Sequence, residues 1–454
     1  SSSDSIIDVR RKKHSAPSPT RLFCICSNSK HSGVRRMLLK TILNRCHKFK
    51  CFVYSEVKFT DHQGSACIEA WIEPRKNSKA ICSGCGAPQP GYDTALEPRR
   101  FEFIPVWGIP VYFLYFMRRV NCKTCGVRTE EVPWGHGKKQ LTKVYMQYLA
   151  NWAQVLSWQE VARHFHTSWE KVFHSVEYVV DWGLKHRSLE GVTAIGVDEI
   201  AWKKGHKYLT LVYQINNGAV RLLWIGKDRT EKTFHIFFDK LGAEKSKLIE
   251  YVCSDMWKAY LKVIRERIPQ SVHVLDRYHI VARLNKALDQ VRAGEHKQMK
   301  SDGFDPILTK ARWLLLKRPE NLTDDQGTKL KDLLKYNLKS MRAYLLKEEF
   351  QLLWTYSSPG WAAKFIDRWT TKVIRSKIEP LKKEAKTIRK HKPLILNYFR
   401  AKKQLSSGIV EGLNNKAKLT MRKSYGFREY KSIEIALYHS LGKLPEPPLT
   451  HRFY

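Results

Sequence analysis

Three acidic residues lie far apart in the sequence but could come together in the folded chain: Asp198, Asp255 and Glu411. Asp198 follows the apolar run 192–197 and Asp255 follows the run 249–254, so each is expected at the end of a buried strand. Carboxylates held close together repel one another, and a divalent cation supplies the opposite charge. Two such cations about 3.5 to 4 Å apart can cut a phosphodiester bond. The residues therefore predict a magnesium or manganese site.

The third acid belongs to a predicted helix near the C-terminus. Glu411 lies in its first turn, and Asn414, Asn415 and Lys418 follow at i+3, i+4 and i+7. This spacing places an acid, two amides and a cation on one helical face. We expect that face to complete the site of the other two acids.

Each acid also has a purely structural explanation. Asp198 could end a strand, Asp255 could cap the helix that follows it, and Glu411 could lie in a first helical turn without binding a metal. Asp276 and His279, in the segment Asp-Arg-Tyr-His, are weaker candidates for the same site, because the aspartate is also well placed to cap a helix. The three acids favour catalysis only in combination.

Two pairs of cysteines have the spacing of a second metal site. Cys82 and Cys85 form one C-x-x-C pair, Cys122 and Cys125 form another, and 36 residues lie between the pairs. Four thiolates arranged in this way are typical of a tetrahedral structural zinc site on two hairpins, a zinc ribbon. A single C-x-x-C pair could instead be a redox dithiol, but two pairs favour zinc.

The first two acids belong to a region whose pattern alternates between strand and helix. Its apolar runs predict strands at residues 192–198, 208–213, 220–225, 249–255 and 271–276. Helical patterns at 231–247 and 258–267 separate the last three strands, and residues 216–218 predict a hairpin turn. The order β-β-β-α-β-α-β is that of an RNase H-like fold, in which the first and fourth strands are neighbours. That pairing would bring the two aspartates to one crevice.

A helix-turn-helix is predicted ahead of this core. Ser157-Trp-Gln-Glu160 and Thr167-Ser-Trp-Glu170 both match a capping box, in which a hydroxyl and a carboxylate satisfy free amides at the start of a helix. Residues 168–180 would then be the recognition helix. The candidates for contacts with base edges and phosphates are Arg163, Ser168, Trp169 and Lys171. The alternative is the core of a helical hairpin, formed by Trp169, Val172, Phe173 and Val176.

The composition indicates a partner of opposite charge. The chain carries 81 Lys and Arg against 43 Asp and Glu, a net charge of +38 that opposes compaction unless a polyanion neutralises it. Nucleic acid, here double-stranded DNA, is the first partner to expect. An anionic membrane surface is the competing interpretation, but no apolar run approaches the roughly 18 residues of a membrane helix. The N-terminus lacks the layout of a secretory signal, so we expect a cytoplasmic, nucleoid-associated protein.

The 454 residues are enough for several modules, and the expected fold class is multidomain α/β. Long helical patterns between residues 280 and 403 predict an all-α insertion, whose tryptophans are more often core than base-stacking platforms: Trp313, Trp354, Trp361 and Trp369. The expected division is a disordered basic tail (1–36), an N-terminal β module with the zinc ribbon (37–138), the helix-turn-helix (139–188), the first part of the RNase H-like core (189–280), the helical insertion (281–403) and the C-terminal core helices with the third acid (404–454).

Together these motifs resemble those of a known family. The chain is similar to the ISL-three family of bacterial insertion-sequence transposases in its two C-x-x-C pairs, its helix-turn-helix, and the segments Gly196-Val-Asp-Glu199, Cys253-Ser-Asp-Met-Trp257, Asp276-Arg-Tyr-His279 and Val410-Glu-Gly-Leu-Asn-Asn415. The likeness covers about residues 45 to 445. The first and last of these segments are the most specific.

The resemblance implies a DDE transposase, a Mg-dependent polynucleotidyl transferase. Such an enzyme binds the terminal inverted repeats of its element, cleaves phosphodiester bonds there and joins the freed 3′ ends to target DNA. By motif, Asp198, Asp255 and Glu411 are its catalytic triad, and a homodimer on DNA is expected because two ends must be paired. Two other functions stay open: an RNase H-like nuclease without strand transfer, and a catalytically inactive zinc-ribbon and helix-turn-helix DNA-binding regulator.

Overall fold

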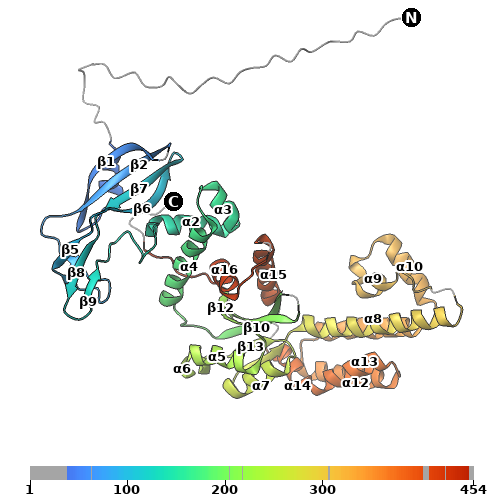
Figure 1. Ribbon diagram of the computed structural model, residues 1–454. Helices are drawn as coiled ribbons and strands as arrows, with labels where there is room; N and C mark the ends of the chain where they lie inside the picture. The colour runs from blue at the N-terminus through green and yellow to red at the C-terminus, as the bar shows by residue number, and fades with distance from the viewer. Residues whose placement is uncertain are drawn as a thin grey trace, which may run out of the picture.

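The computed structural model describes residues 38–62, 64–203, 205–216, 218–304, 307–401, 408–424 and 426–448. Within these ranges the chain is a mixed α/β protein of several modules, with a β-rich N-terminal part, a central sheet and a helical arm (Figure 1). The predicted basic tail, residues 1–36, lies outside the described residues. Among the described helices, none combines the length and apolar character needed to cross a membrane.

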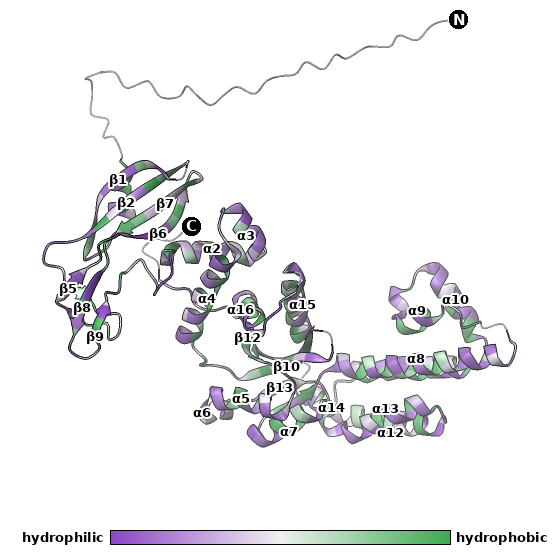
Figure 2. Ribbon diagram, in the orientation of Figure 1, coloured by the Kyte–Doolittle hydropathy of each residue, from purple (hydrophilic) through white to green (hydrophobic). Residues whose placement is uncertain are grey.

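The N-terminal module is built on a four-stranded sheet. Its elements are α1 (Leu39–Cys46), β1 (Phe52–His62), β2 (Ser65–Pro74), β6 (Arg99–Val106) and β7 (Ile109–Tyr115). The strand order is β1-β2-β7-β6, in which β2 and β7 are parallel and the other pairs antiparallel. Apolar and polar residues are interspersed along these strands (Figure 2), and the apolar ones form a core around Tyr54, Phe101, Phe113 and Trp134.

Two smaller sheets extend from this module. They are formed by β3 (Ala80–Ile81) with β4 (Pro88–Gln89), and by β5 (Gly91–Thr94), β8 (Arg118–Cys122) and β9 (Gly126–Thr129) in the order β5-β8-β9. Their buried cluster consists of Ala80, Cys82, Val120 and Cys122, with Cys125 packed against it. These sheets therefore have little apolar core of their own.

Three helices follow the β module, and the first predicted capping box is confirmed. The helices are α2 (Lys143–Val155), α3 (Trp158–His164) and α4 (Trp169–His186). At the start of α3, the Ser157 hydroxyl accepts a hydrogen bond from the Glu160 amide at 3.3 Å. The Glu160 carboxylate accepts one from the Ser157 amide at 2.7 Å. Both ends of the predicted motif are therefore formed.

The second predicted capping box is not formed, because α4 begins one residue later than the motif requires and its third residue is Lys171 rather than Glu170. Ser168, not Thr167, is the N-cap of α4, and its hydroxyl accepts a hydrogen bond from the Lys171 amide at 3.2 Å. The reason is that the Thr167 amide donates to the Ala162 carbonyl at 2.9 Å, so Thr167 still belongs to the turn that ends α3. The helix also continues to His186, past the predicted end at residue 180.

The centre of the molecule is a five-stranded sheet with the order β12-β11-β10-β13-β14. Its strands are β10 (Ala194–Lys203), β11 (Lys207–Asn216), β12 (Ala219–Gly226), β13 (Tyr251–Ser254) and β14 (Val272–Leu275). The first and fourth predicted strands, β10 and β13, pair in parallel as expected, and β13 pairs in parallel with β14. The predicted hairpin is present, with Asn216 opposite Ala219, while Asn217 lies outside the described residues.

The strand β10 is longer than its sequence pattern predicted. The pattern ends at Asp198, but the strand continues to Lys203 because its hairpin with β11 extends past that residue. Its pairing with β13 ends earlier, at Val197 opposite Ser254. Asp198 and Asp255 are therefore the next residues of the two chain segments after this last pair.

Helices cover both faces of the central sheet (Figure 1). One face carries α5 (Glu231–Leu241) and α7 (Lys258–Arg267), which share an apolar cluster with the sheet. The predicted helix 231–247 is divided at Gly242, whose φ of 86° ends α5 before the short α6 (Ala243–Lys247). The other face carries α15 (Gly408–Lys423) and α16 (Tyr430–Leu441), which share a second cluster with α2 and α4.

The segment between β14 and α15 is helical over its described residues, as predicted. Its elements are α8 (Arg277–Ser301), α9 (Arg312–Leu316), η1 (Pro319–Asn321), α10 (Asp324–Leu334), α11 (Lys339–Gln351), η2 (Leu352–Thr355), α12 (Pro359–Arg375), α13 (Glu379–Lys390) and α14 (Lys392–Arg400). Trp354 and Trp369 belong to its core, whereas Trp313 and Trp361 are 58% and 61% exposed. The expectation of core tryptophans therefore holds for two of the four.

Candidate functional site

Asp198 is held from two sides in the central sheet. It is buried on β10, with 8% of its surface exposed. Its Oδ2 atom accepts a hydrogen bond from the side-chain amide of Asn414 on α15. The Asn414 Oδ1 atom in turn accepts one from the Tyr213 hydroxyl at 2.7 Å. Because buried polar groups depend on such partners, this chain of bonds fixes α15 against the Asp198 carboxylate.

Asp255 follows directly after β13, beside Asp198. Its Oδ1 atom accepts a hydrogen bond from the Trp257 amide at 2.9 Å, within the turn that precedes α7. Trp257 itself is the N-cap of that helix, so Asp255 is not the helix cap that the structural explanation expected. Burial is the largest cause of a raised pKa of Asp255, and the negative charges of Asp198 and Asp276 raise it further. The hydrogen bond from the Trp257 amide and the charge of His279 lower this pKa, but not enough to cancel the rise. A carboxylate in this position is therefore stabilised by a nearby cation.

Asp276 and His279, the weaker candidates, lie at the same place. The Asp276 carboxylate caps α8 by accepting a hydrogen bond from the Tyr278 amide at 2.7 Å. The His279 Nε2 atom lies 3.7 Å from Asp198 Oδ1 and 3.8 Å from Asp276 Oδ2. Burial disfavours the charged imidazole and by itself lowers the pKa of His279. The nearby carboxylates, of which Asp198 has the largest effect, outweigh burial and raise this pKa to about 9. The acidic cluster thus favours a cation in its midst.

Glu411 lies one helical turn before Asn414, in the first turn of α15, and is exposed. Of the residues predicted to share its face, Asn414 alone is buried and reaches Asp198, while Asn415 and Lys418 are exposed. Glu411 lines a cavity of about 260 Å³, together with Arg277, Tyr278 and Arg318. Glu411 therefore shares this cavity with the guanidinium groups of two arginines.

A second cavity, also of about 260 Å³, lies on the Asp255 side of the cluster. Its charged and aromatic lining consists of Asp255, Trp257, His279, Arg283 and Lys286. Arg283 is paired with Glu384 at 2.7 Å, whereas Lys286 is an exposed cation on α8. Basic side chains thus flank the acids on both sides, which suits an anionic substrate.

The separation of the acids bears on the number of ions they can hold. Among the described residues, only a cysteine cluster brings three or more possible ligand atoms to within 4.8 Å of one another. Oxygen ligands of a single Mg²⁺ lie about 2.1 Å from it, hence within roughly 4.2 Å of one another. Two ions about 3.5 to 4 Å apart separate their outer ligands by several ångström more. Among the described residues the three acids therefore do not form a compact one-ion site, and only a wider, two-ion arrangement of them would agree with this spacing.

The sequence did not reveal how Asp255 is supported. The Arg229 guanidinium lies 3.9 Å from the Tyr208 ring centroid and 4.5 Å from that of Trp257. Its Nη1 atom is 2.7 Å from Glu199 Oε1, and the Trp257 indole donates to the Arg229 carbonyl at 3.0 Å. Through Arg229, these contacts join Glu199, the neighbour of Asp198, to Trp257 in the loop that follows Asp255. The only signal was that Glu199 and Trp257 lie beside the acids in the sequence.

The four predicted zinc ligands come together. The Sγ atoms of Cys82, Cys85, Cys122 and Cys125 all lie within 4.8 Å of one another, and those of Cys85 and Cys122 are 3.6 Å apart. Thiolates about 2.3 Å from a tetrahedral zinc ion are roughly 3.8 Å apart, so the arrangement fits that ion. Backbone amides, that of Cys125 first, lower the pKa of the Cys122 thiol to about 7, which favours the metal-binding thiolate.

The residues predicted to contact DNA have unequal surroundings. Arg163 and Trp169 are exposed, and Ser168 uses its hydroxyl to cap α4. The Lys171 Nζ atom lies 2.7 Å from Glu102 of the β module, so this cation already has a partner. Of the alternative hairpin core, Val172 and Val176 are fully buried, whereas Trp169 is 45% exposed. The buried valines thus form a packed face of the helix, and DNA contacts by the exposed residues stay a prediction.

Comparison with known proteins adds an independent finding. Residues 195–437 match a family model described as a transposase. The chain is 30% identical over 353 residues to the transposase for insertion sequence element IS1001 of Bordetella parapertussis, an alignment that covers 77% of this chain and 86% of the relative. It is 29% identical over 432 residues to the transposase for insertion sequence element IS1557 of Mycobacterium tuberculosis strain H37Rv, covering 88% and 95%.

Proposed function

Because the chain belongs to the ISL-three family of insertion-sequence transposases, we propose that it is a DDE transposase that cuts and joins DNA with an RNase H-like core. Asp198, Asp255 and Glu411 would hold two Mg²⁺ or Mn²⁺ ions. The substrates would be the terminal inverted repeats of its own element and a target DNA, to which the freed 3′ ends are joined. The helical insertion, residues 281–403, would interrupt the core.

The observation that carries this proposal is the parallel pairing of β10 with β13. The pairing ends at Val197 and Ser254, so the next residues, Asp198 and Asp255, lie side by side. The helix α15, with Glu411 in its first turn, is fastened to the same place by the hydrogen bond from Asn414. These contacts support a shared site for acids that are far apart in the sequence.

The chemistry divides between the cations and the chain. Bound cations would supply the positive charge that activates water or a 3′ hydroxyl and stabilises the departing oxygen. Arg277 and Arg318, which line the cavity beside Glu411, would hold the phosphates on either side of the cut. The contacts of Arg229 with Trp257 would keep Asp255 in position during the reaction.

DNA recognition would fall to other modules. We propose α3 and α4 as a helix-turn-helix, with Ser168 and Trp169 at the exposed start of the recognition helix and Arg163 at the end of α3 before it. Lys171 could reach a phosphate only by leaving Glu102, so it would contribute least. The zinc ribbon would order the adjoining β module, and two copies of the chain would pair the two element ends.

The test is cleavage of inverted-repeat DNA in Mg²⁺ by purified protein. Replacing Asp255 by Asn removes a charge that a cation needs, a loss of several kcal/mol of transition-state stabilisation, so cleavage should fall by about 10³-fold. The matched control is Asp325→Asn, an exposed acid on α10 that should leave cleavage unchanged. Equal cleavage by wild type and Asp255→Asn would refute the site.

The same reaction separates the two other functions. Labelled 3′ ends should become covalently joined to target DNA, and cleavage without joining would instead indicate a nuclease. A DNA-binding regulator would bind the repeats but take up no Mn²⁺ at the acids. Titration with Mn²⁺, followed by its paramagnetic signal, should show binding by wild type that Asp255→Asn weakens.

A further inference from the structure

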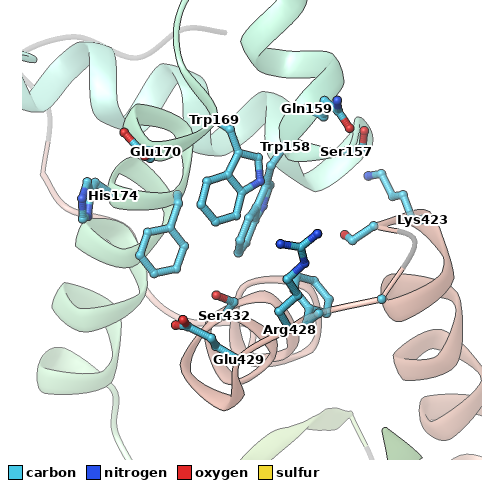
Figure 3. Close-up of a pocket in the computed structure, with 14 residues that line it drawn as sticks. Ser157, Trp158, Gln159, Trp169, Glu170, His174, Lys423, Arg428, Glu429 and Ser432 are labelled. Atoms are coloured by element: carbon cyan, nitrogen blue, oxygen red, sulfur yellow. The ribbon is translucent and has the colours of Figure 1, made fainter. Parts of the chain in front are cut away.

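A cavity of about 770 Å³ lies where α3 and α4 meet the segment that joins α15 to α16. Figure 3 shows its lining, with the side chains of α3 and α4 on one side and those of the α15–α16 segment on the other. Small-molecule sites commonly enclose about 300 to 1,000 Å³, so the volume suits a ligand rather than a single water molecule. None of the acids of the proposed active site lines it.

One wall of the cavity is aromatic. Trp158 is buried, and its ring centroid lies 5.6 Å from those of Phe173 and Phe427. Trp169 stacks on Phe173 with an interplanar angle of 7° and remains 45% exposed. A large indole held in place by a second ring but open to solvent on its other side is a ready stacking platform.

The opposite edge of the cavity is basic. In Figure 3 the Arg428 guanidinium points toward the indole rings of Trp158 and Trp169. Lys423 also lines the cavity, and its Nζ atom donates a hydrogen bond to the Gln154 carbonyl at 3.2 Å. Glu170 and Glu429 also line the cavity, on the other side of this view from Lys423. An anionic group that entered would therefore be directed first toward the arginine, with the lysine as a second cation at the rim.

We propose that this cavity receives one unpaired nucleotide of the DNA end, with its base stacked on Trp169 and its phosphate near Arg428 and Lys423. The inference rests on the proposed function, since α4 would bring the duplex to this place. Every base has a π-face, so an aromatic platform beside cations binds a base without regard to its identity. The net charge of +38 favours such a polyanion over an apolar or cationic ligand.

The position of the cavity gives the bound nucleotide a role. Trp169 is the first residue of α4, the proposed recognition helix, so an unpaired nucleotide stacked there would adjoin the recognised duplex. The opposite wall of the cavity is formed by the chain segment that comes directly after α15, the helix that carries Glu411. Occupation of the cavity would therefore link recognition of the end to the helix that bears the third acid.

The experiment compares two inverted-repeat duplexes, one fully paired and one with a single unpaired 2-aminopurine at its end. Wild type should bind the unpaired end about tenfold more tightly, and stacking on Trp169 should quench the 2-aminopurine fluorescence. Arg428→Ala should lose most of this preference while still binding the paired duplex. Arg422→Ala, an exposed arginine at the end of the same helix as Lys423 but outside the cavity, should keep the preference.

The outcomes separate this inference from the function it rests on. Equal affinity for the two duplexes, with the 2-aminopurine still bright in the complex, would overturn the nucleotide site and leave the transposase proposal standing. Loss of preference in Arg422→Ala and Arg428→Ala alike would also overturn it, because any surface cation would then suffice. Failure of wild type to bind either duplex would contradict DNA-end recognition itself.

Discussion

Two neighbouring asparagines on α15 have the same side chain and opposite surroundings. Asn414 is 5% exposed, donates to Asp198 and accepts from Tyr213, whereas Asn415 is exposed to solvent. A buried carboxylate and a buried hydroxyl that lose a partner keep the full cost of their desolvation. The first amide is therefore a positioning residue for the proposed active site, and the second is its natural control.

We expect Asn414→Ala to destabilise the region around β10 by about 1 to 3 kcal/mol, because the Asp198 Oδ2 atom and the Tyr213 hydroxyl lose their partner, while Asp198 Oδ1 keeps its hydrogen bond from the Glu199 amide. Asn415→Ala should change stability by less than about 0.5 kcal/mol. Native-state hydrogen exchange of the β10 amides measures this local free energy of opening without requiring the whole chain to unfold in one step. Equal protection of β10 in the two variants would show that the hydrogen bonds do not hold the strand.

At the scale of elements, the two small sheets of the N-terminal part pose a stability problem. Their strands contain two to five residues, and their buried cluster is made largely of the cysteines themselves. So small an apolar cluster cannot offset the entropy of ordering the chain. A metal bound by four thiolates would supply the missing free energy, as it does in other small zinc modules.

We therefore expect purified protein to contain about one zinc ion per chain, and Cys122→Ser to lose it together with the ordered β5-β8-β9 sheet. Cys51→Ser is the matched control, since Cys51 lies in the same module but outside the cluster, and it should retain the metal. Zinc content by atomic absorption and limited proteolysis between residues 80 and 130 measure the two effects. A zinc-free wild type that resists the protease would contradict a structural role for the ion.

The elements also show what sequence could and could not predict. Strong local patterns gave the strands of the central sheet, the adjacency of β10 and β13, and the capping box at Ser157, because each depends on neighbouring residues or on one simple pairing rule. The end of β10 and the cap of α4 were misplaced, since the hairpin with β11 and the turn after α3 decide them. These are competitions between hydrogen bonds that a pattern does not contain.

Contacts between distant side chains that follow no pairing rule or motif were beyond the sequence. The placement of Arg229 between Tyr208 and Trp257 joins residues up to 49 positions apart, and no spacing rule relates them. The cavity beside Trp169 is completed by Phe427 and Arg428, from the far end of the chain. Such sites depend on how whole elements pack, which follows from shape and burial rather than from local pattern.

At the scale of the whole molecule, charge is the dominant property. A surplus of 38 positive charges implies that DNA binding releases many counterions, whatever the sequence of the DNA. Many of the cations are paired within the protein, as Arg267 is with Asp239 at 2.7 Å, and cations of this kind should contribute little. Arg163, by contrast, is exposed at the end of α3 near the proposed recognition helix.

Affinity for inverted-repeat DNA should therefore fall steeply with salt. A surface that contacts roughly 6 to 10 phosphates loses about 10³ to 10⁵ in affinity between 50 and 200 mM salt. Arg163→Ala should reduce the slope of log affinity against log salt by about one, whereas Arg267→Ala should leave it unchanged because that cation stays with its carboxylate. Fluorescence anisotropy at four or more salt concentrations gives the slopes, with unrelated DNA as a reference for the sequence-independent part. A slope near zero for wild type would mean that the basic surface does not meet the phosphates, and equal slopes for the two variants would remove Arg163 from the interface.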